Sequence, residues 1–195
     1  MNIPQDFEDI TKEKVFDFQE EKAKSEGTAL NKDYRDLLLE IIPGSINIRK
    51  APLKEDKEGT DWWVDYSHRE PISIDIKARD LDPLNFDRDP KDDLILETWS
   101  NIEKKIPGWT LNPNKRTDYI LWFWKPTGRY LLLSFPKLLY VFIKNWKKWK
   151  EIYPIDTTKS RGSYGITWKS EYIKVPRKIV LGEIDRIFHG LSTNY

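Results

Sequence analysis

The residues with the clearest capacity for chemistry lie in two short segments, residues 59–61 and 72–79. Residues 72–79 read ISIDIKAR and are rich in β-branched side chains, which predicts a β-strand. Successive side chains of a strand point to opposite faces, so the three isoleucines share one face and Asp75 and Lys77 share the other. If the isoleucine face is core, a carboxylate and an amine lie two residues apart on the opposite face and can form one site.

Asp61 is expected to join this pair. It opens the segment DWWVDY, and the short polar connector at residues 67–70 predicts a hairpin with the strand at 72–79. Two carboxylates a few ångströms apart repel one another unless a cation lies between them. A divalent metal meets that demand, and Lys77 could stabilise charge developing on a phosphate or orient an attacking water. Hydrolysis of a phosphodiester bond needs such a set of groups.

Composition restricts the other possibilities. The 195 residues include no Cys, which excludes disulfides, thiolate metal sites and Cys-based catalysis. The two histidines, His68 and His189, lie in no zinc or Ser-His-Asp motif. A metal would therefore be held mainly by carboxylates, which favours Mg²⁺ or Mn²⁺ over Zn²⁺.

Length and charge set the broad class. The chain has the size of a single domain, and we expect one domain over residues 1–195. The formal net charge of +1 does not indicate a partner, although acidic residues dominate the first half and basic residues the stretch 137–178. No signal peptide or membrane-spanning stretch is present in the sequence, so we expect no membrane partner and a cytoplasmic location.

The distribution of apolar residues predicts an α/β (α+β) domain with a central mixed β-sheet flanked by helices. Helices are predicted at residues 6–27, 31–42 and 137–153, with a small one at 183–188. Strands are predicted at residues 61–66, 71–79, 94–100, 118–124 and 129–135, consecutive in a meander, followed by a β-rich C-terminal tail that forms a short strand pair at 163–176.

The segments GTDWW and IDIKAR together resemble the D…(D/E)-x-K signature of the PD-(D/E)XK, or restriction-endonuclease-like, nucleases. The resemblance covers roughly residues 31–142 and implies a restriction-endonuclease-like core. It implies that Asp61 and Asp75 bind Mg²⁺, together with the backbone carbonyl of Ile76, and that Lys77 serves catalysis. The Pro of the signature is absent, since Thr60 precedes Asp61, as in many members.

The family often adds an acidic residue from a preceding helix. Asp33 and Asp36 stand at that place, with Glu40 as a third option. Asp65 shares the face of Asp61 and ranks second as the metal ligand of that strand. Glu97 and Ser100, on the next predicted strand, could border the site.

Basic residues near the C-terminus are candidates for contact with nucleic acid. In the helix at 137–153, lysines alternate with Trp146 and Trp149, a pattern that suits stacking on bases and neutralising phosphates. The same pattern fits an amphipathic helix whose tryptophans pack inward, and this interpretation is favoured. The candidates for nucleic-acid binding are Lys144, Lys147, Lys148 and Arg161.

The expected function is a Mg²⁺-dependent deoxyribonuclease, either a repair-type enzyme or a small restriction, phage or mobile-element nuclease. Cutting both strands of DNA would favour a homodimer, because one such site cuts one strand. Two alternatives remain: a nucleic-acid-binding module that keeps the nuclease fold without cleaving, and a protein-interaction or inhibitory factor.

Overall fold

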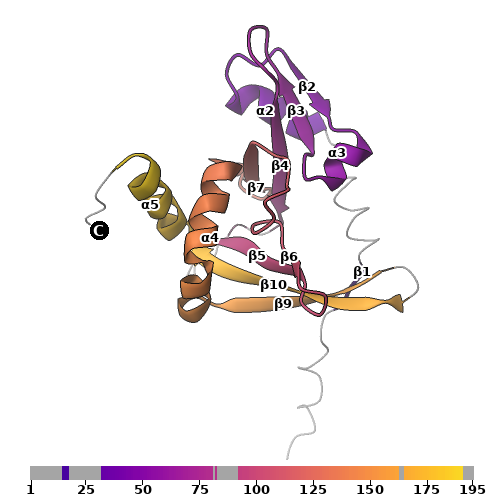
Figure 1. Cartoon of the computed structure of the whole chain (residues 1–195). Helices are drawn as coiled ribbons and strands as arrows, with labels where there is room; N and C mark the ends of the chain where they lie inside the picture. The colour runs from indigo at the N-terminus through magenta and orange to yellow at the C-terminus, as the bar shows by residue number, and fades with distance from the viewer. Residues whose placement is uncertain (1–14, 18–31, 81, 83–91, 163–164, 191–195) are drawn as a thin grey trace, which may run out of the picture.

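The computed structural model describes residues 15–17, 32–80, 82, 92–162 and 165–190 (Figure 1). Within these ranges the chain forms two five-stranded sheets and four helices. The predicted mixed class of helices and strands is thereby confirmed. No helix in the described part of the chain is long and apolar enough to cross a bilayer.

The first sheet carries the residues predicted to do chemistry. Its spatial order is β2 (Asn47–Lys50), β3 (Trp62–Asp65), β4 (Ile72–Arg79), β7 (Tyr119–Trp124) and β8 (Arg129–Ser134). All neighbouring strands are antiparallel except β4 and β7, which run parallel. The sheet is therefore mixed, and the predicted β3–β4 hairpin is present.

The second sheet is assembled mostly from later parts of the chain. Its order is β1 (Val15–Asp17), β9 (Ile155–Arg161), β10 (Thr167–Pro176), β5 (Asp93–Asn101) and β6 (Ile106–Pro107). β1 and β9 are parallel, and the other neighbours are antiparallel. In Figure 1 this sheet lies below the first one.

Different helices cover the two faces of the first sheet. Tyr34 and Leu38 of α2 (Lys32–Ile41) belong to one core cluster with Val64 and Ile74, so α2 covers the isoleucine face of β4. The short α3 (Leu53–Lys57) connects β2 to β3. The opposite face packs toward α4, as the main core shows.

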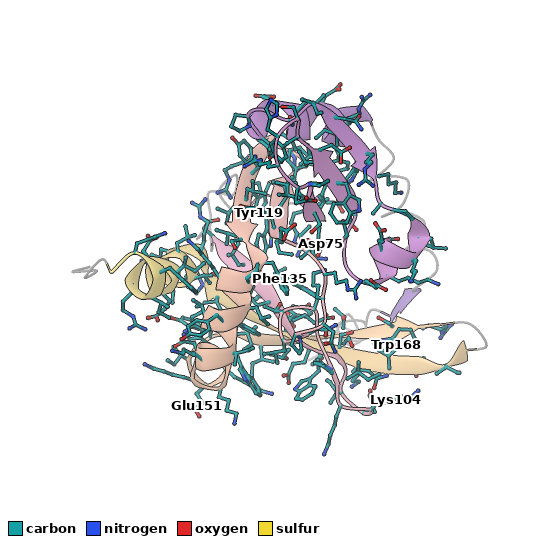
Figure 2. The ribbon with its side chains drawn as sticks, turned by 45° about the horizontal axis from the view of Figure 1, so that its top comes forward. Asp75, Lys104, Tyr119, Phe135, Glu151 and Trp168 are labelled. Atoms are coloured by element: carbon teal, nitrogen blue, oxygen red, sulfur yellow. The ribbon has the colours of Figure 1, made fainter. Side chains whose placement is uncertain are left out.

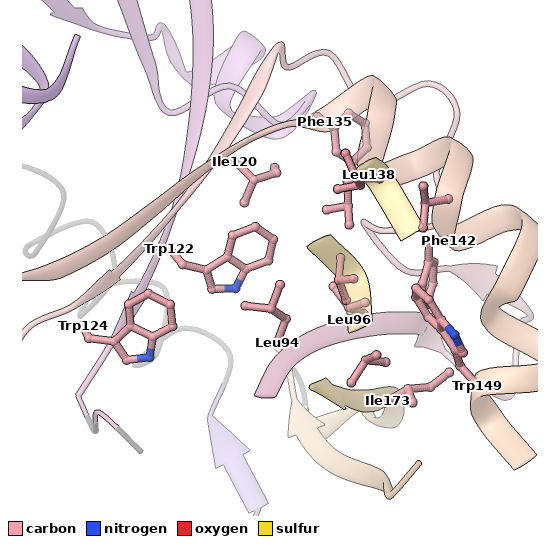
Figure 3. Close-up of a cluster of buried hydrophobic side chains, with 14 residues drawn as sticks. Leu94, Leu96, Ile120, Trp122, Trp124, Phe135, Leu138, Phe142, Trp149 and Ile173 are labelled. Carbon is pink, nitrogen blue, oxygen red and sulfur yellow. The ribbon is translucent and has the colours of Figure 1, made fainter. Parts of the chain in front are cut away.

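The main core joins both sheets to α4 (Phe135–Ile152) and α5 (Arg177–Phe188) (Figure 3). Pro136 is tolerated in the first turn of α4 because no intrahelical bond to its nitrogen is required there. Large buried side chains of this core come from β5, β7, β10 and α4, among them Leu94, Leu96, Trp122, Trp124, Phe142, Trp149 and Ile173.

The predicted meander is wrong beyond β4. The segment LILETWS forms β5 in the second sheet, where it pairs with β10, and β7 takes the place beside β4. The tail is not a short strand pair: β10 has ten residues and lies at the centre of its sheet. In these positions Leu94, Leu96 and Ile173 are fully buried in the main core, which favours this arrangement.

Two helix predictions also change. The final helix is longer than expected and spans Arg177–Phe188. The predicted helix at 6–27 lies outside the described residues except for Val15–Asp17, which form a strand that pairs with β9. The helix predicted at 137–153 is confirmed as α4.

Candidate active site

Asp61 is held against β4 by its own backbone and side chain. Its amide donates to the carbonyl of Ile74 at 2.9 Å, and its Oδ2 accepts from the amide of Ile76 at 2.7 Å. Asp61 directly precedes β3, which begins at Trp62. Its side chain therefore continues the contact with β4 past the last backbone pair of the two strands. The carboxylate is therefore fixed beside residues 75–77.

Asp75 is buried, with 3% of its surface exposed, and two lysine ammonium groups contact it. Lys77 Nζ lies 2.9 Å from Oδ1 and 2.8 Å from Oδ2. Lys115 Nζ lies 2.7 Å from Oδ2. Asp75 projects from the middle of the first sheet on the side that faces the second sheet (Figure 2).

Lys115 reaches this site from the loop before β7, and the segment Gly59-Thr60 holds that loop in place. Lys115 Nζ donates to the carbonyl of Gly59 at 2.9 Å, and the Thr60 hydroxyl donates to the carbonyl of Arg116. Gly59 has a φ of +105°, and a Cβ there would lie 2.7 Å from Cγ of Lys115. A glycine before Thr60 and Asp61 therefore provides the space for Lys115.

The surroundings shift the pKa values of Asp61 and Asp75 in opposite directions. Burial and the neighbouring charge of Asp75 raise the pKa of Asp61 to about 7, and a hydrogen bond between the two carboxyl groups adds to this shift. Burial also disfavours ionised Asp75, but Lys77 and Lys115 outweigh it and lower the pKa of Asp75 to about 2. Asp75 is therefore the firmly charged carboxylate of the pair, and Asp61 gives up its charge more readily.

We expect Asp61→Asn to stabilise the metal-free protein increasingly as pH rises. In the unfolded chain Asp61 ionises near its ordinary pKa, whereas in the folded chain it ionises only near pH 7. Between these values wild-type stability falls with rising pH, and the neutral Asn does not share that loss. The gain of the variant over wild type should grow by about 2–3 kcal/mol between pH 5 and pH 8. Urea unfolding in EDTA measures it, and a gain independent of pH would contradict the raised pKa.

Glu97 borders this cluster from the second sheet. Its Oε2 accepts from the amide of Trp109 at 2.9 Å, and burial raises the pKa of its carboxyl group while Lys77 and Lys115 oppose that rise. Lys77 Nζ also lies 5.1 Å from the centre of the Trp109 ring. The expectation that Glu97 lies near the site therefore agrees with the structure.

A pocket of about 780 Å³ adjoins the candidate site on the second sheet. Glu97 belongs to its wall as well as to the surroundings of Lys77. The remaining wall is largely apolar and also carries hydroxyl and charged groups, among them Ser100, Glu103, Lys104, Ser160, Trp168 and Ser170. Ser100 thus lines the pocket rather than contacting Asp61 or Asp75. A ligand of several polar groups can lie here and reach Glu97.

Gly108 is required for the close approach of its loop to Glu97. A Cβ at residue 108 would lie 2.5 Å from Cγ and 2.6 Å from the backbone oxygen of Glu97. We expect Gly108→Ala to lower the free energy of unfolding by about 1–3 kcal/mol, because backbone must move. Gly182→Ala in α5, where a Cβ meets nothing within 4 Å, should instead raise it by about 1 kcal/mol. Denaturant unfolding of both variants tests this, and equal effects would contradict it.

The helix acids expected to complete a metal site are not brought to Asp61 and Asp75. Asp36 and Glu40 are exposed on α2, which covers the opposite face of the sheet, so the strands separate them from Asp75. Asp33 lies in α2, and its side chain is outside the described residues. Asp65 does not substitute for Asp61, because its carboxylate bonds Asn47 and Arg49 at the edge of the sheet.

The basic residues predicted to bind nucleic acid are all exposed: Lys144, Lys147, Lys148 and Arg161. Trp149 is buried, and Trp146 packs edge-on against Trp99 with ring centres 6.5 Å apart. The favoured interpretation of α4 as an amphipathic helix is therefore confirmed. Arg161 ends β9, a strand that leads away from α4, so it lies apart from the lysines (Figure 1).

The donor set partly fits a divalent metal. Asp61 and Asp75 supply hard oxygen ligands, and Mg²⁺ commonly uses one or two carboxylates with water and substrate phosphate. The described residues contain no group of three or more His, Cys, Asp or Glu side chains arranged to hold a metal. A metal at Asp75 would also have to share its oxygens with Lys77 or Lys115.

Comparisons of this chain with protein families, with curated proteins and with solved structures gave no match. The function must therefore be argued from the geometry of the site.

Proposed function

We propose that this protein is a metal-dependent nuclease that hydrolyses phosphodiester bonds of DNA. One observation carries the proposal: Asp61 and Asp75 lie together, and Lys77 places its ammonium 2.8 Å from Asp75 on the same strand. Paired carboxylates beside a fixed cation are the groups that metal-assisted hydrolysis of a phosphate ester uses.

Each residue has a role in this proposal. Asp61 and Asp75, with the carbonyl of Ile76, would hold Mg²⁺ or Mn²⁺, which would polarise a phosphoryl oxygen and acidify a bound water. Lys77 offers positive charge to the phosphate as negative charge develops on it. Lys115, with 6% of its side chain exposed, holds Asp75 in position from the other side.

The surroundings provide space for a nucleic-acid strand. The pocket that shares Glu97 with the site can receive nucleotides that flank the reacting phosphate. The exposed lysines of α4, Lys144, Lys147 and Lys148, and Arg161 of β9 would contribute to long-range attraction of the polyanion. A homodimer would be required if both strands of a duplex are cut, because each chain supplies one such site.

The proposal is tested with plasmid, branched and single-stranded DNA in Mg²⁺, Mn²⁺ or EDTA. We expect cleavage only with metal, and its loss in Asp61→Asn, which still offers an acceptor to the amide of Ile76. Calorimetric titration of the metal should show weaker binding by the variant, while circular dichroism should show unchanged folding. If the wild-type protein neither cleaves DNA nor binds the metal, the proposal is ruled out.

A second candidate is a nucleic-acid-binding module that does not cleave. The observation that favours it is the pair of ammonium groups on Asp75, which balance its charge without a metal. This candidate predicts DNA binding that is the same in EDTA and Mg²⁺ and is unaffected by Asp61→Asn. The same titrations therefore separate the two functions.

A further inference from the structure

β4 carries another cation on the face of Asp75 and Lys77. Arg79 follows Lys77 by two residues, so the three side chains form a row with steps of about 6.6 Å. Their partners on β7 are Ile120, Trp122 and Trp124, which all point into the main core. Arg79 therefore continues the candidate site along its strand.

Arg79 has no carboxylate partner at ion-pair distance among the described residues. The hydrogen bond of its guanidinium goes to the carbonyl of the adjacent Ala78, at 3.2 Å. Asp75, the nearest buried carboxylate on the same strand, already contacts Lys77 and Lys115.

Arg129 and Arg177 differ from Arg79 in this respect. Arg129 bonds Asp82 at 2.8 Å and 3.0 Å, and Arg177 lies 2.6 Å from Asp92. These ion pairs have a structural role, since they join the ends of β8 and β10 to the segment before β5. Arg79 makes no such connection within the described part of the chain.

Arg79 is also partly removed from water in the folded protein. The residue is half-buried, and burial lowers the pKa of its guanidinium. Asp75 and Asp80 offset part of this cost electrostatically, but neither lies at ion-pair distance from the guanidinium. An anionic ligand would supply the acceptors that the guanidinium lacks. Because the partners of this row on β7 point into the core that joins both sheets, an anion held by Arg79 would lie between the two sheets.

We propose that Arg79 binds a backbone phosphate of a nucleic-acid strand, next to the phosphate that reacts at Lys77. A guanidinium suits this role because its planar donors bond two phosphate oxygens at once. The inference rests on the proposed nucleic-acid function, but it does not require cleavage. It places the strand along β4, from Asp75 toward Arg79.

The test is binding of a labelled single-stranded oligonucleotide, followed by fluorescence anisotropy in EDTA at several salt concentrations. We expect Arg79→Met to weaken binding about tenfold and to reduce the slope of log K against log salt by about 0.7, the contribution of one phosphate contact. Arg79→Lys should lose less affinity and keep the slope, because it retains the charge. Arg186→Met, which removes an exposed arginine of α5, is the matched control and should match wild type.

Unchanged affinity and slope in Arg79→Met would overturn the inference, and so would failure of the wild-type protein to bind. If Arg79→Met does not fold, Arg79→Lys decides: reduced affinity supports the inference, and unchanged affinity overturns it. Because the assay contains no metal, its result is independent of cleavage. If binding depends on Arg79 but the protein cuts no substrate with any metal, the nuclease proposal fails and the phosphate contact of Arg79 still stands.

Discussion

Replacing Asp75 by alanine is expected to lower the free energy of unfolding by about 3–5 kcal/mol in metal-free buffer. The carboxylate contacts Lys77 and Lys115, whose side chains are 23% and 6% exposed. Removing it leaves two ammonium groups close together and largely out of water, with only the carboxyl group of Asp61 nearby to offset their charge. Urea unfolding at neutral pH measures the loss.

Two further variants control this experiment. Asp80→Ala breaks an ion pair with Lys125 in which the carboxylate is 85% exposed, and it should change stability by less than about 1 kcal/mol. Asp75→Ala combined with Lys115→Met should recover part of the loss, because one of the stranded charges is removed. A loss for Asp75→Ala no larger than for Asp80→Ala would show that the buried contacts do not exist as described.

Lys77→Met is expected to reduce metal-dependent cleavage by about 10²–10⁴-fold. Lys77 is the ammonium group that shares the face of Asp75 on the same strand, and methionine keeps its length without its charge. Asp75 retains Lys115 as a partner in this variant, so the fold should tolerate it better than Asp75→Ala. Single-turnover rates with saturating protein measure the effect.

Lys144→Met is the matched control for this prediction. Lys144 is exposed on α4 and lies 4.4 Å from the ring of Tyr140, away from Asp75. Its cleavage rate should stay within about twofold of wild type once protein is saturating, since it contributes only to long-range attraction. Equal rates for Lys77→Met and wild type would exclude Lys77 from the reaction.

The local features of the site could be predicted from the sequence because they depend on neighbouring residues. Alternation in ISIDIKAR places Asp75 and Lys77 on one face, and the short connector forces the β3–β4 hairpin that brings Asp61 close. The inward packing of Trp149 followed from helical spacing in the same way. The catalytic and metal-binding roles of these residues remain predictions.

Lys115 could not be predicted, because no local pattern distinguishes it from other loop lysines. It reaches Asp75 only through the parallel pairing of β4 with β7. That pairing is fixed by distant contacts, among them the bonds of Asp118 Oδ2 with the amide and hydroxyl of Ser73, both 2.8 Å. The one local sign was Gly59, whose positive φ and missing Cβ leave room for the lysine.

The parallel pairing of β4 and β7 also determines when the site can form during synthesis of the chain. Ribosomes deliver the N-terminal part of a chain first, and β4 with its row of charged residues emerges about 40 residues before β7. Until β7 and its preceding loop have left the exit tunnel, Asp75 lacks Lys115 and the central strand β4 lacks its neighbour β7. A nascent chain is therefore unable to assemble the cluster of Asp75, Lys77 and Lys115 until most of the polypeptide has been made.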